Sequence, residues 1–188
     1  RADGPADRER YQTVFAREAG SVAAPTAGLH FTPPLLGELT RKGVETVEVV
    51  LHVGPGTFRP VEVDDVRQHR VEPELYTIPG DTAAAVTRAR AERRRIVAVG
   101  TTSTRNLEAA LDPDGCLPAG DGETDLVITP GYRFRAIEAL VTNFHLPRSS
   151  LLLLVSAFAG RQRTLDTYAE AVRRRYRFYS YGDASLIL

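Results

Sequence analysis

Four histidines are the residues of this chain best suited to acid–base chemistry near neutral pH, since an unperturbed imidazole has a pKa of about 6.5. They are His30, His52, His69 and His145. His30, His52 and His145 each lie where a predicted strand or loop meets a glycine or proline turn, a common place for active-site residues. The alternative is a hydrogen-bonded structural histidine in a turn. No HExxH or other close histidine pair is present, so the sequence predicts no metal site.

Hydroxyl groups follow a predicted strand in "VAVGTTSTR", residues 97–105. An apolar strand that ends at Gly100 and enters a helix through Thr101, Thr102 and Ser103 places hydroxyls and backbone N–H groups at the strand's C-terminal end. Ligands of open α/β sheets bind at such ends, and a helix N-terminus favours anionic groups. Simple helix capping by Thr102 or Ser103 is the alternative. Neither GxxxxGK nor GxGxxG is present, so the segment is not a standard phosphate loop.

Two further polar clusters lie near the C-terminus. "NFHLPRSSLLLL" places Asn143 and His145 at the end of a predicted strand, before a leucine helix capped by Ser149 or Ser150. "SYGDAS" offers Tyr181 and Asp183 on a glycine loop, which is either a turn signal or an acid–base pair.

Strands are predicted to alternate with helices, which indicates an α/β fold with a sheet covered on both faces. Helices are expected over residues 6–18, 33–43, 81–94, 101–111, 149–160 and 164–176, the last with Leu165, Tyr168 and Val172 on its buried face. Strands are expected over residues 44–53, 75–78, 95–100, 125–129 and 139–144 and at the C-terminus. The unbroken apolar run at 95–100 predicts a strand buried on both faces.

Composition excludes several classes of protein. The 188 residues are 43% hydrophobic and 26% charged with no net charge, as in globular proteins and unlike a generally cationic nucleic-acid binder. The single cysteine, Cys116, excludes an internal disulfide and is expected to be an exposed thiol in a loop. The longest apolar run, residues 151–159, is too short to span a membrane, and no signal sequence is visible; we therefore expect a cytoplasmic protein without a membrane partner.

Six long blocks occur in order along the chain: "GSVAAPTAGLHFT", "LHVGPGTFRPV", "VGTTSTRNLE", "PGYRF", "TNFHLPRSSLLLLVSAFAG" and "YRFYSYGDASLIL". Together they resemble the S-adenosylmethionine:tRNA ribosyltransferase-isomerase family of queuosine biosynthesis, and the resemblance runs from Tyr11 to Leu188. It implies a mixed β-sheet flanked by helices. It also implies that residues 1–10 are a linker remnant, that residues 11–188 are the C-terminal part of the large α/β domain, and that the family's small β-barrel domain is absent from this chain.

The resemblance also implies an activity. Members transfer and isomerise the ribosyl part of S-adenosylmethionine, a co-substrate, onto 7-aminomethyl-7-deazaguanine at the wobble position of tRNA, and they release adenine and methionine. No metal is implied, and we expect a monomer. On the matching blocks, the expected catalytic residues are His30, His52, His145 and Asp183. The expected binding residues for co-substrate or modified base are Thr101, Thr102, Ser103, Arg105, Asn143, Tyr132, Tyr181 and Arg59.

Two positions depart from the family pattern. Glu72 stands where a second histidine is expected, and Asn106 stands where a threonine is expected. These departures leave two alternatives open. One is a paralogue that uses S-adenosylmethionine on a small-molecule deazapurine or nucleoside. The other is a non-catalytic tRNA-binding piece of a larger protein.

Overall fold

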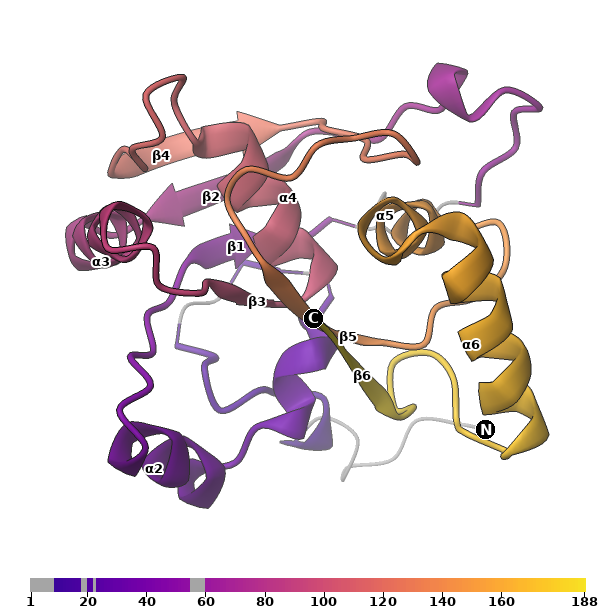
Figure 1. Cartoon of the computed structure of the whole chain (residues 1–188), viewed down its shortest axis with the longest axis horizontal. Coiled ribbons are helices and arrows are strands. Elements are labelled where there is room, and N and C mark those ends of the chain that lie inside the picture. The colour runs from indigo at the N-terminus through magenta and orange to yellow at the C-terminus, as the bar shows by residue number, and fades with distance from the viewer. Residues whose placement is uncertain (1–8, 18–19, 22, 55–59) are drawn as a thin grey trace.

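Two small β-sheets and the helices around them make up the fold. A computed structural model describes residues 9–17, 20–21, 23–54 and 60–188 (Figure 1). In this part of the chain the helices are α2 (Pro33–Arg41), α3 (Gly80–Ala91), α4 (Thr101–Ala110), α5 (Ser150–Ala159) and α6 (Arg161–Arg173), with short 3-10 turns η1 (Thr26–His30) and η3 (Val66–Gln68). The strands are β1 (Val50–His52), β2 (Glu74–Ile78), β3 (Val97–Val99), β4 (Gly120–Thr124), β5 (Ala139–Asn143) and β6 (Ala184–Ile187).

The first sheet is antiparallel and has the order β1-β2-β4. Its register pairs Tyr76 with Leu51 on one side and with Gly122 on the other. A Cβ atom at Gly122 would lie 2.5 Å from the Tyr76 ring, so only glycine lets this ring lie flat across β4.

The second sheet has the order β3-β5-β6 and is mixed, since β3 pairs parallel and β6 antiparallel to β5. The expectation of a mixed sheet is therefore confirmed, although the fold divides its strands between two sheets. The prediction that residues 95–100 are buried on both faces is wrong. β3 pairs only with β5 among the described strands, so it is an edge strand, and Val97 is 46% exposed while Ala98 is buried.

One apolar core joins the two sheets. It contains Tyr76 and Ile78 from the first sheet, Ala98 and Leu140 from the second, and Leu107 from α4. Helix α4 lies at the centre of the molecule and contacts strands of both sheets, while α5 and α6 pack together on one side and α3 lies on the other (Figure 1). The N-terminal end of α4 therefore has a rigid position relative to β3 and β5.

Helix ends follow the local sequence. Thr32 caps α2 by accepting a hydrogen bond from Leu35 N at 3.3 Å, and Ser149, one of the two candidates, caps α5 by accepting from Leu151 N at 3.1 Å. Helices α2, α3 and α6 each end in a left-handed residue with the paired backbone hydrogen bonds of a Schellman motif. The left-handed residues are Gly43, Arg93 and Arg175.

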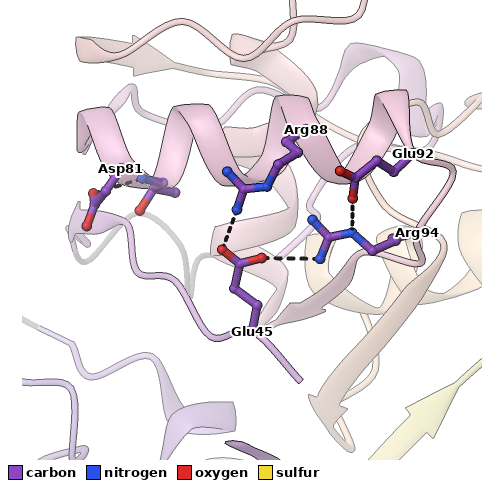
Figure 2. A network of polar contacts seen from close by, with 6 residues as sticks. Glu45, Asp81, Arg88, Glu92 and Arg94 are labelled. Carbon is purple, nitrogen blue, oxygen red and sulfur yellow. Dashed lines mark hydrogen bonds and ion pairs between the residues drawn. The ribbon is translucent and has the colours of Figure 1, made fainter. Parts of the chain in front are cut away.

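The predicted strand over residues 44–53 is confirmed only at Val50–His52. Its first half instead runs beside α3 and is held by side chains. Figure 2 shows Arg88 and Arg94 converging on Glu45, at 2.6 and 3.2 Å. Thr82 also donates to Glu48 O at 2.6 Å. These contacts from α3 replace the pairing that a longer strand would need.

Two other predicted elements are wrong. Residues 11–17 form turns instead of continuing a helix, because Ala16 N bonds to Thr13 O and the Phe15 ring packs on Phe31. Residues 125–129, expected to be a strand, form none, and the strand β4 lies just before them. Ile128 is nonetheless buried in the core, which explains its apolar pattern.

The buried face of α6 is also rotated from the prediction. Leu165 and Val172 are 43% and 65% exposed, whereas Thr164 and Ala171 are buried. Tyr168, the third residue of the predicted face, does point inward, because its hydroxyl accepts a hydrogen bond from His145 N at 3.0 Å. That bond fixes the rotation of α6 and joins it to the end of β5.

Candidate active site

A cavity opens at the C-terminal ends of β3 and β5. Since the two strands are parallel, their C-terminal ends meet at the same edge of the sheet, where α/β proteins bind ligands. The cavity is bordered by η1, the start of α4, the residues after β5 and the loop that precedes β6. Its lining residues are Ala24, Pro25, Thr26, Ala27, Val53, Gly100, Thr101, Thr102, Thr142, Asn143, His145, Leu151, Tyr179 and Ser180.

Asn143 joins three of these segments. Its Nδ2 lies 3.2 Å from His30 Nε2 and donates to Tyr179 O at 3.2 Å, while its Oδ1 accepts from Thr26 Oγ1 at 3.4 Å. An amide nitrogen only donates, so His30 Nε2 accepts and the proton of a neutral His30 ring is on Nδ1. The buried Asn143 amide thus sets both the place and the tautomer of His30.

His145 lies on the cavity wall with 8% of its surface exposed. Its Nε2 is 2.9 Å from Thr142 Oγ1, and its backbone N–H donates to Tyr168. Burial lowers the pKa of His145 to about 4, because a charged imidazolium would lose its hydration there. The ring is therefore neutral at pH 7.

The N-terminus of α4 faces the same cavity. Gly100 is the N-cap with a φ of 100°, a left-handed conformation that suits glycine, and no side chain caps the helix. The alternative of capping by Thr102 or Ser103 is therefore wrong. Thr101 and Thr102 line the cavity and Ser103 does not, although Ser103 lies in the first turn. The backbone N–H groups of this turn are thus placed to receive an acceptor group from a ligand.

Arg105 and Tyr132 were predicted as binding residues and lie outside the cavity lining. Arg105 is buried against Glu74 at 2.9 Å and also donates to Leu126 O, so it joins α4 to the first sheet. Burial lowers the pKa of Arg105, partly offset by Glu74. The Tyr132 hydroxyl donates to Glu108, and burial beside this carboxylate raises the pKa of Tyr132 to about 12.

Asp183, Tyr181 and His52 also lie outside the lining. Asp183 closes a loop by accepting from Arg177 N and from the Arg177 side chain at 2.7 and 2.9 Å, and the hydrogen bond from that guanidinium lowers its pKa. Tyr181 is 46% exposed and its ring lies edge-on to Tyr11. His52, at the end of β1, is half-buried, and the next residue, Val53, lines the cavity. Arg59 lies outside the described residues.

Sequence reasoning missed several lining residues. Thr26 lies in the block that contains His30, and Thr142 directly precedes Asn143, so proximity to the predicted residues was a usable signal. Tyr179 and Ser180 directly precede the predicted Tyr181, so the same signal applied to them, and a tertiary hydrogen bond from Tyr179 N to Phe144 O brings their loop to the cavity.

In the described part of the chain, no group of three or more His, Cys, Asp or Glu side chains is placed to hold a metal ion. None of the helices described is long and apolar enough to cross a membrane. Cys116 is exposed, as predicted.

Comparison with known proteins gives consistent matches. A family model described as queuosine biosynthesis protein matches residues 1–187. The S-adenosylmethionine:tRNA ribosyltransferase-isomerase of Moorella thermoacetica is 60% identical over 184 residues, which cover 98% of this chain and 54% of that protein. The enzyme of the same name from Citrifermentans bemidjiense is 58% identical over 187 residues, which cover 100% of this chain and 54% of that protein.

A solved structure is similar as well. The S-adenosylmethionine tRNA ribosyltransferase of Thermotoga maritima superposes with a TM-score of 0.72 at 48% identity, and the match covers 86% of this chain and 51% of that chain. The present chain thus spans about half the length of the relatives it matches.

Proposed function

Because this chain belongs to the family of queuosine biosynthesis proteins, we propose that the complete gene product acts as an S-adenosylmethionine:tRNA ribosyltransferase-isomerase. It transfers and isomerises the ribosyl moiety of S-adenosylmethionine onto 7-aminomethyl-7-deazaguanine in tRNA, and it releases adenine and methionine. The observation that carries the proposal for this chain is one cavity lined by Asn143, His145 and the uncapped start of α4, with His30 outside the lining and 3.2 Å from Asn143 Nδ2.

The cavity suits the charged end of S-adenosylmethionine. The methionine part of this co-substrate carries a carboxylate, and the N-terminal turn of a helix attracts such an anion through its N–H groups and its dipole. The uncapped turn at Thr101, Thr102 and Ser103 offers these groups beside the cavity. We therefore place the carboxylate at the start of α4.

His145 is our proposed proton acceptor. The positive sulfur of S-adenosylmethionine makes the proton on a neighbouring carbon acidic, and its removal requires an unprotonated base. Burial keeps the His145 ring in that form at pH 7.

His30 is our proposed hydrogen-bond donor to the leaving base. With Nε2 accepting from the Asn143 amide, the neutral ring carries its proton on Nδ1. A hydrogen bond from this Nδ1–H to a ring nitrogen of adenine stabilises the negative charge that develops on the departing base. Asn143 is a positioning residue in this scheme, because it acts through His30.

Adenine release tests the proposal. The complete gene product is incubated with S-adenosylmethionine and either tRNA that bears 7-aminomethyl-7-deazaguanine or the free base, and adenine is followed by chromatography. We expect release with the tRNA. Release with the free base alone would favour the small-molecule paralogue, tRNA binding without release would favour a non-catalytic role, and S-adenosylhomocysteine as product would indicate methyl transfer.

The variant His145→Gln tests the base. It should lower the rate of adenine release by about 10²- to 10⁴-fold, the usual contribution of a general base. Glu138→Gln is the control, because Glu138 directly precedes β5 and so lies at the opposite end of the strand from the cavity, where it accepts from Ile96 N. Equal rates for His145→Gln and the unchanged protein would remove His145 from this role.

A further inference from the structure

Arginines are concentrated where α3 ends and the chain enters β3. Residues 88–95 hold five arginines and one glutamate, in a chain whose formal net charge is zero. Two of the five lie in the last turn of α3, where a positive charge interacts favourably with the helix dipole. The other three, Arg93, Arg94 and Arg95, lie beyond the helix, so they need another explanation.

Contacts within the chain account for three of the five arginines. Figure 2 shows that Arg88 and Arg94 are both held by Glu45, at 2.6 and 3.2 Å. Arg90 is half-buried and donates to Gly115 O at 2.8 Å. These three side chains thus join α3 to the segment before β1 and to the loop before β4.

Arg93 and Arg95 are different. Both are exposed, and neither guanidinium has a hydrogen-bond or ion-pair partner in the part of the chain that the structure describes. A guanidinium is planar and always charged, and it donates two parallel hydrogen bonds to a phosphate group. We call these two residues the arginine corner. It offers two uncommitted positive groups in a chain that is neutral as a whole, which favours a polyanionic partner.

The arginine corner has a defined place relative to the cavity. Gly100 borders the cavity, and Arg95 lies five positions before it along the chain, with β3 between them. At about 3.3 Å per residue, the separation is about 17 Å. Phosphates follow one another at about 3.4 Å along the axis of a duplex strand, so this separation corresponds to about five nucleotides.

We propose that the arginine corner binds the phosphate backbone of the acceptor RNA, about five nucleotides from the base that is modified. The inference rests on the proposed function, which supplies the RNA, and it adds a second place of contact on this chain, away from the cavity. Phosphate contacts position a nucleic acid and carry no direct sequence information. The corner therefore contributes affinity and register, and the cavity selects the base.

Three double variants separate the corner from general electrostatics. Arg93→Gly with Arg95→Ala, the corner variant, removes both guanidiniums, and glycine suits the left-handed φ of 55° at position 93. Arg161→Ala with Arg163→Ala, the α6 variant, removes the same charge from two exposed arginines on the other side of the molecule (Figure 1). Arg93→Lys with Arg95→Lys, the lysine variant, keeps the charge of the corner.

The affinity of the complete gene product for tRNA that bears 7-aminomethyl-7-deazaguanine is measured by fluorescence anisotropy at several salt concentrations. Each phosphate contact contributes about 0.7–0.9 to the slope of log affinity against log salt, or about 5- to 8-fold in affinity at 0.1 M salt compared with 1 M. The corner variant should therefore bind about 25- to 60-fold more weakly at 0.1 M salt, with a slope smaller by about 1.4–1.8. The α6 and lysine variants should keep the slope of the unchanged protein.

Adenine release separates the corner from the chemistry. The corner variant should raise the KM for tRNA without lowering kcat, because its contact is made equally in the ground state and in the transition state. An unchanged slope for the corner variant, or a loss of affinity as large in the α6 or the lysine variant, would overturn the proposed contact and leave the proposed function intact. Binding of tRNA by the unchanged protein without adenine release would overturn the proposed function instead, and a loss confined to the corner variant would still support the contact.

Discussion

His145 illustrates how one residue's environment decides its chemistry. Its ring is buried on the cavity wall, and within the described part of the chain the residue forms hydrogen bonds with two neutral hydroxyls, those of Thr142 and Tyr168. Neither hydroxyl compensates for the lost hydration of an imidazolium, so burial dominates and the pKa falls to about 4. A neutral ring at this position is the form that proton acceptance requires.

This low pKa predicts how stability depends on pH. In the unfolded chain His145 has a pKa of about 6.5 and takes up a proton as the pH falls, whereas the folded protein takes it up only near pH 4. The contribution of His145 to the free energy of unfolding is therefore complete above pH 6.5. It should fall by about 3 kcal/mol on the way to pH 4, at about 1.4 kcal/mol per pKa unit.

Urea unfolding of the unchanged protein and of His145→Gln at several pH values measures this contribution. The carboxylates titrate in both proteins, so the difference between the two curves isolates His145. That difference should shrink as the pH falls from 6.5 to 4. Parallel curves would contradict a neutral, buried imidazole.

At the scale of elements, α4 is the helix that links site and scaffold. Its first turn faces the cavity, and further along Arg105 pairs with Glu74 of β2 in the interior. Asn106, next to Arg105, is fully buried, and neither of its amide atoms has a hydrogen-bond partner among residues 9–17, 20–21, 23–54 and 60–188. Each unpaired buried polar group of this kind costs about 1–3 kcal/mol.

Asn106→Thr should therefore stabilise the protein by about 1–2 kcal/mol. Threonine has nearly the same volume, and its hydroxyl can donate to the carbonyl four residues earlier, as Thr104 already does to Gly100 O at 3.0 Å. The urea midpoint should rise with an unchanged slope. The reverse exchange, Thr104→Asn, is the matched control and should lower the midpoint; a lower midpoint for Asn106→Thr would contradict the account.

Elements with a strong local signal were predictable from sequence. Thr32 and Ser149 cap α2 and α5 as their patterns indicate, and the strand ending at Asn143 lies where it was expected. Of the helix expected over 6–18, residues 11–17 form turns instead, because packing of Phe15 on Phe31 decides that segment. The first half of the 44–53 strand failed because ion pairs from α3 hold it outside the sheet.

The candidate site was predictable to a similar degree. Thr101, Thr102, Asn143 and His145 were predictable because each follows or ends a predicted strand. The two strands are parallel and end at the same edge of the sheet, so these four residues line one cavity. The same reasoning could not separate these residues from Arg105, whose partner Glu74 is 31 positions away. The family itself was predictable, because the six sequence blocks are long; the match of the family model to residues 1–187 confirms it.

For the molecule as a whole, the shared core determines cooperativity. The two sheets do not pair with each other, yet Tyr76 and Ile78 of one and Ala98 and Leu140 of the other belong to a single buried cluster that includes Leu107 of α4. Neither sheet can lose α4 without exposing part of that cluster. We therefore expect the described part of the chain to unfold as one cooperative unit.

Two tryptophan reporters test this cooperativity, since the chain contains no tryptophan of its own. Leu75→Trp on β2 and Leu186→Trp on β6 change residues that are 56% and 60% exposed, so each reporter follows one sheet with little disturbance. The two fluorescence curves in urea should share one midpoint and slope, and far-UV circular dichroism should follow both.

Adding Leu107→Ala, a truncation in the shared core, to each reporter protein should lower the free energy of unfolding equally in both, by about 2–5 kcal/mol. A shift confined to one reporter would show that the sheets unfold separately, and the cavity between η1, α4 and the end of β5 would then depend on the second sheet alone.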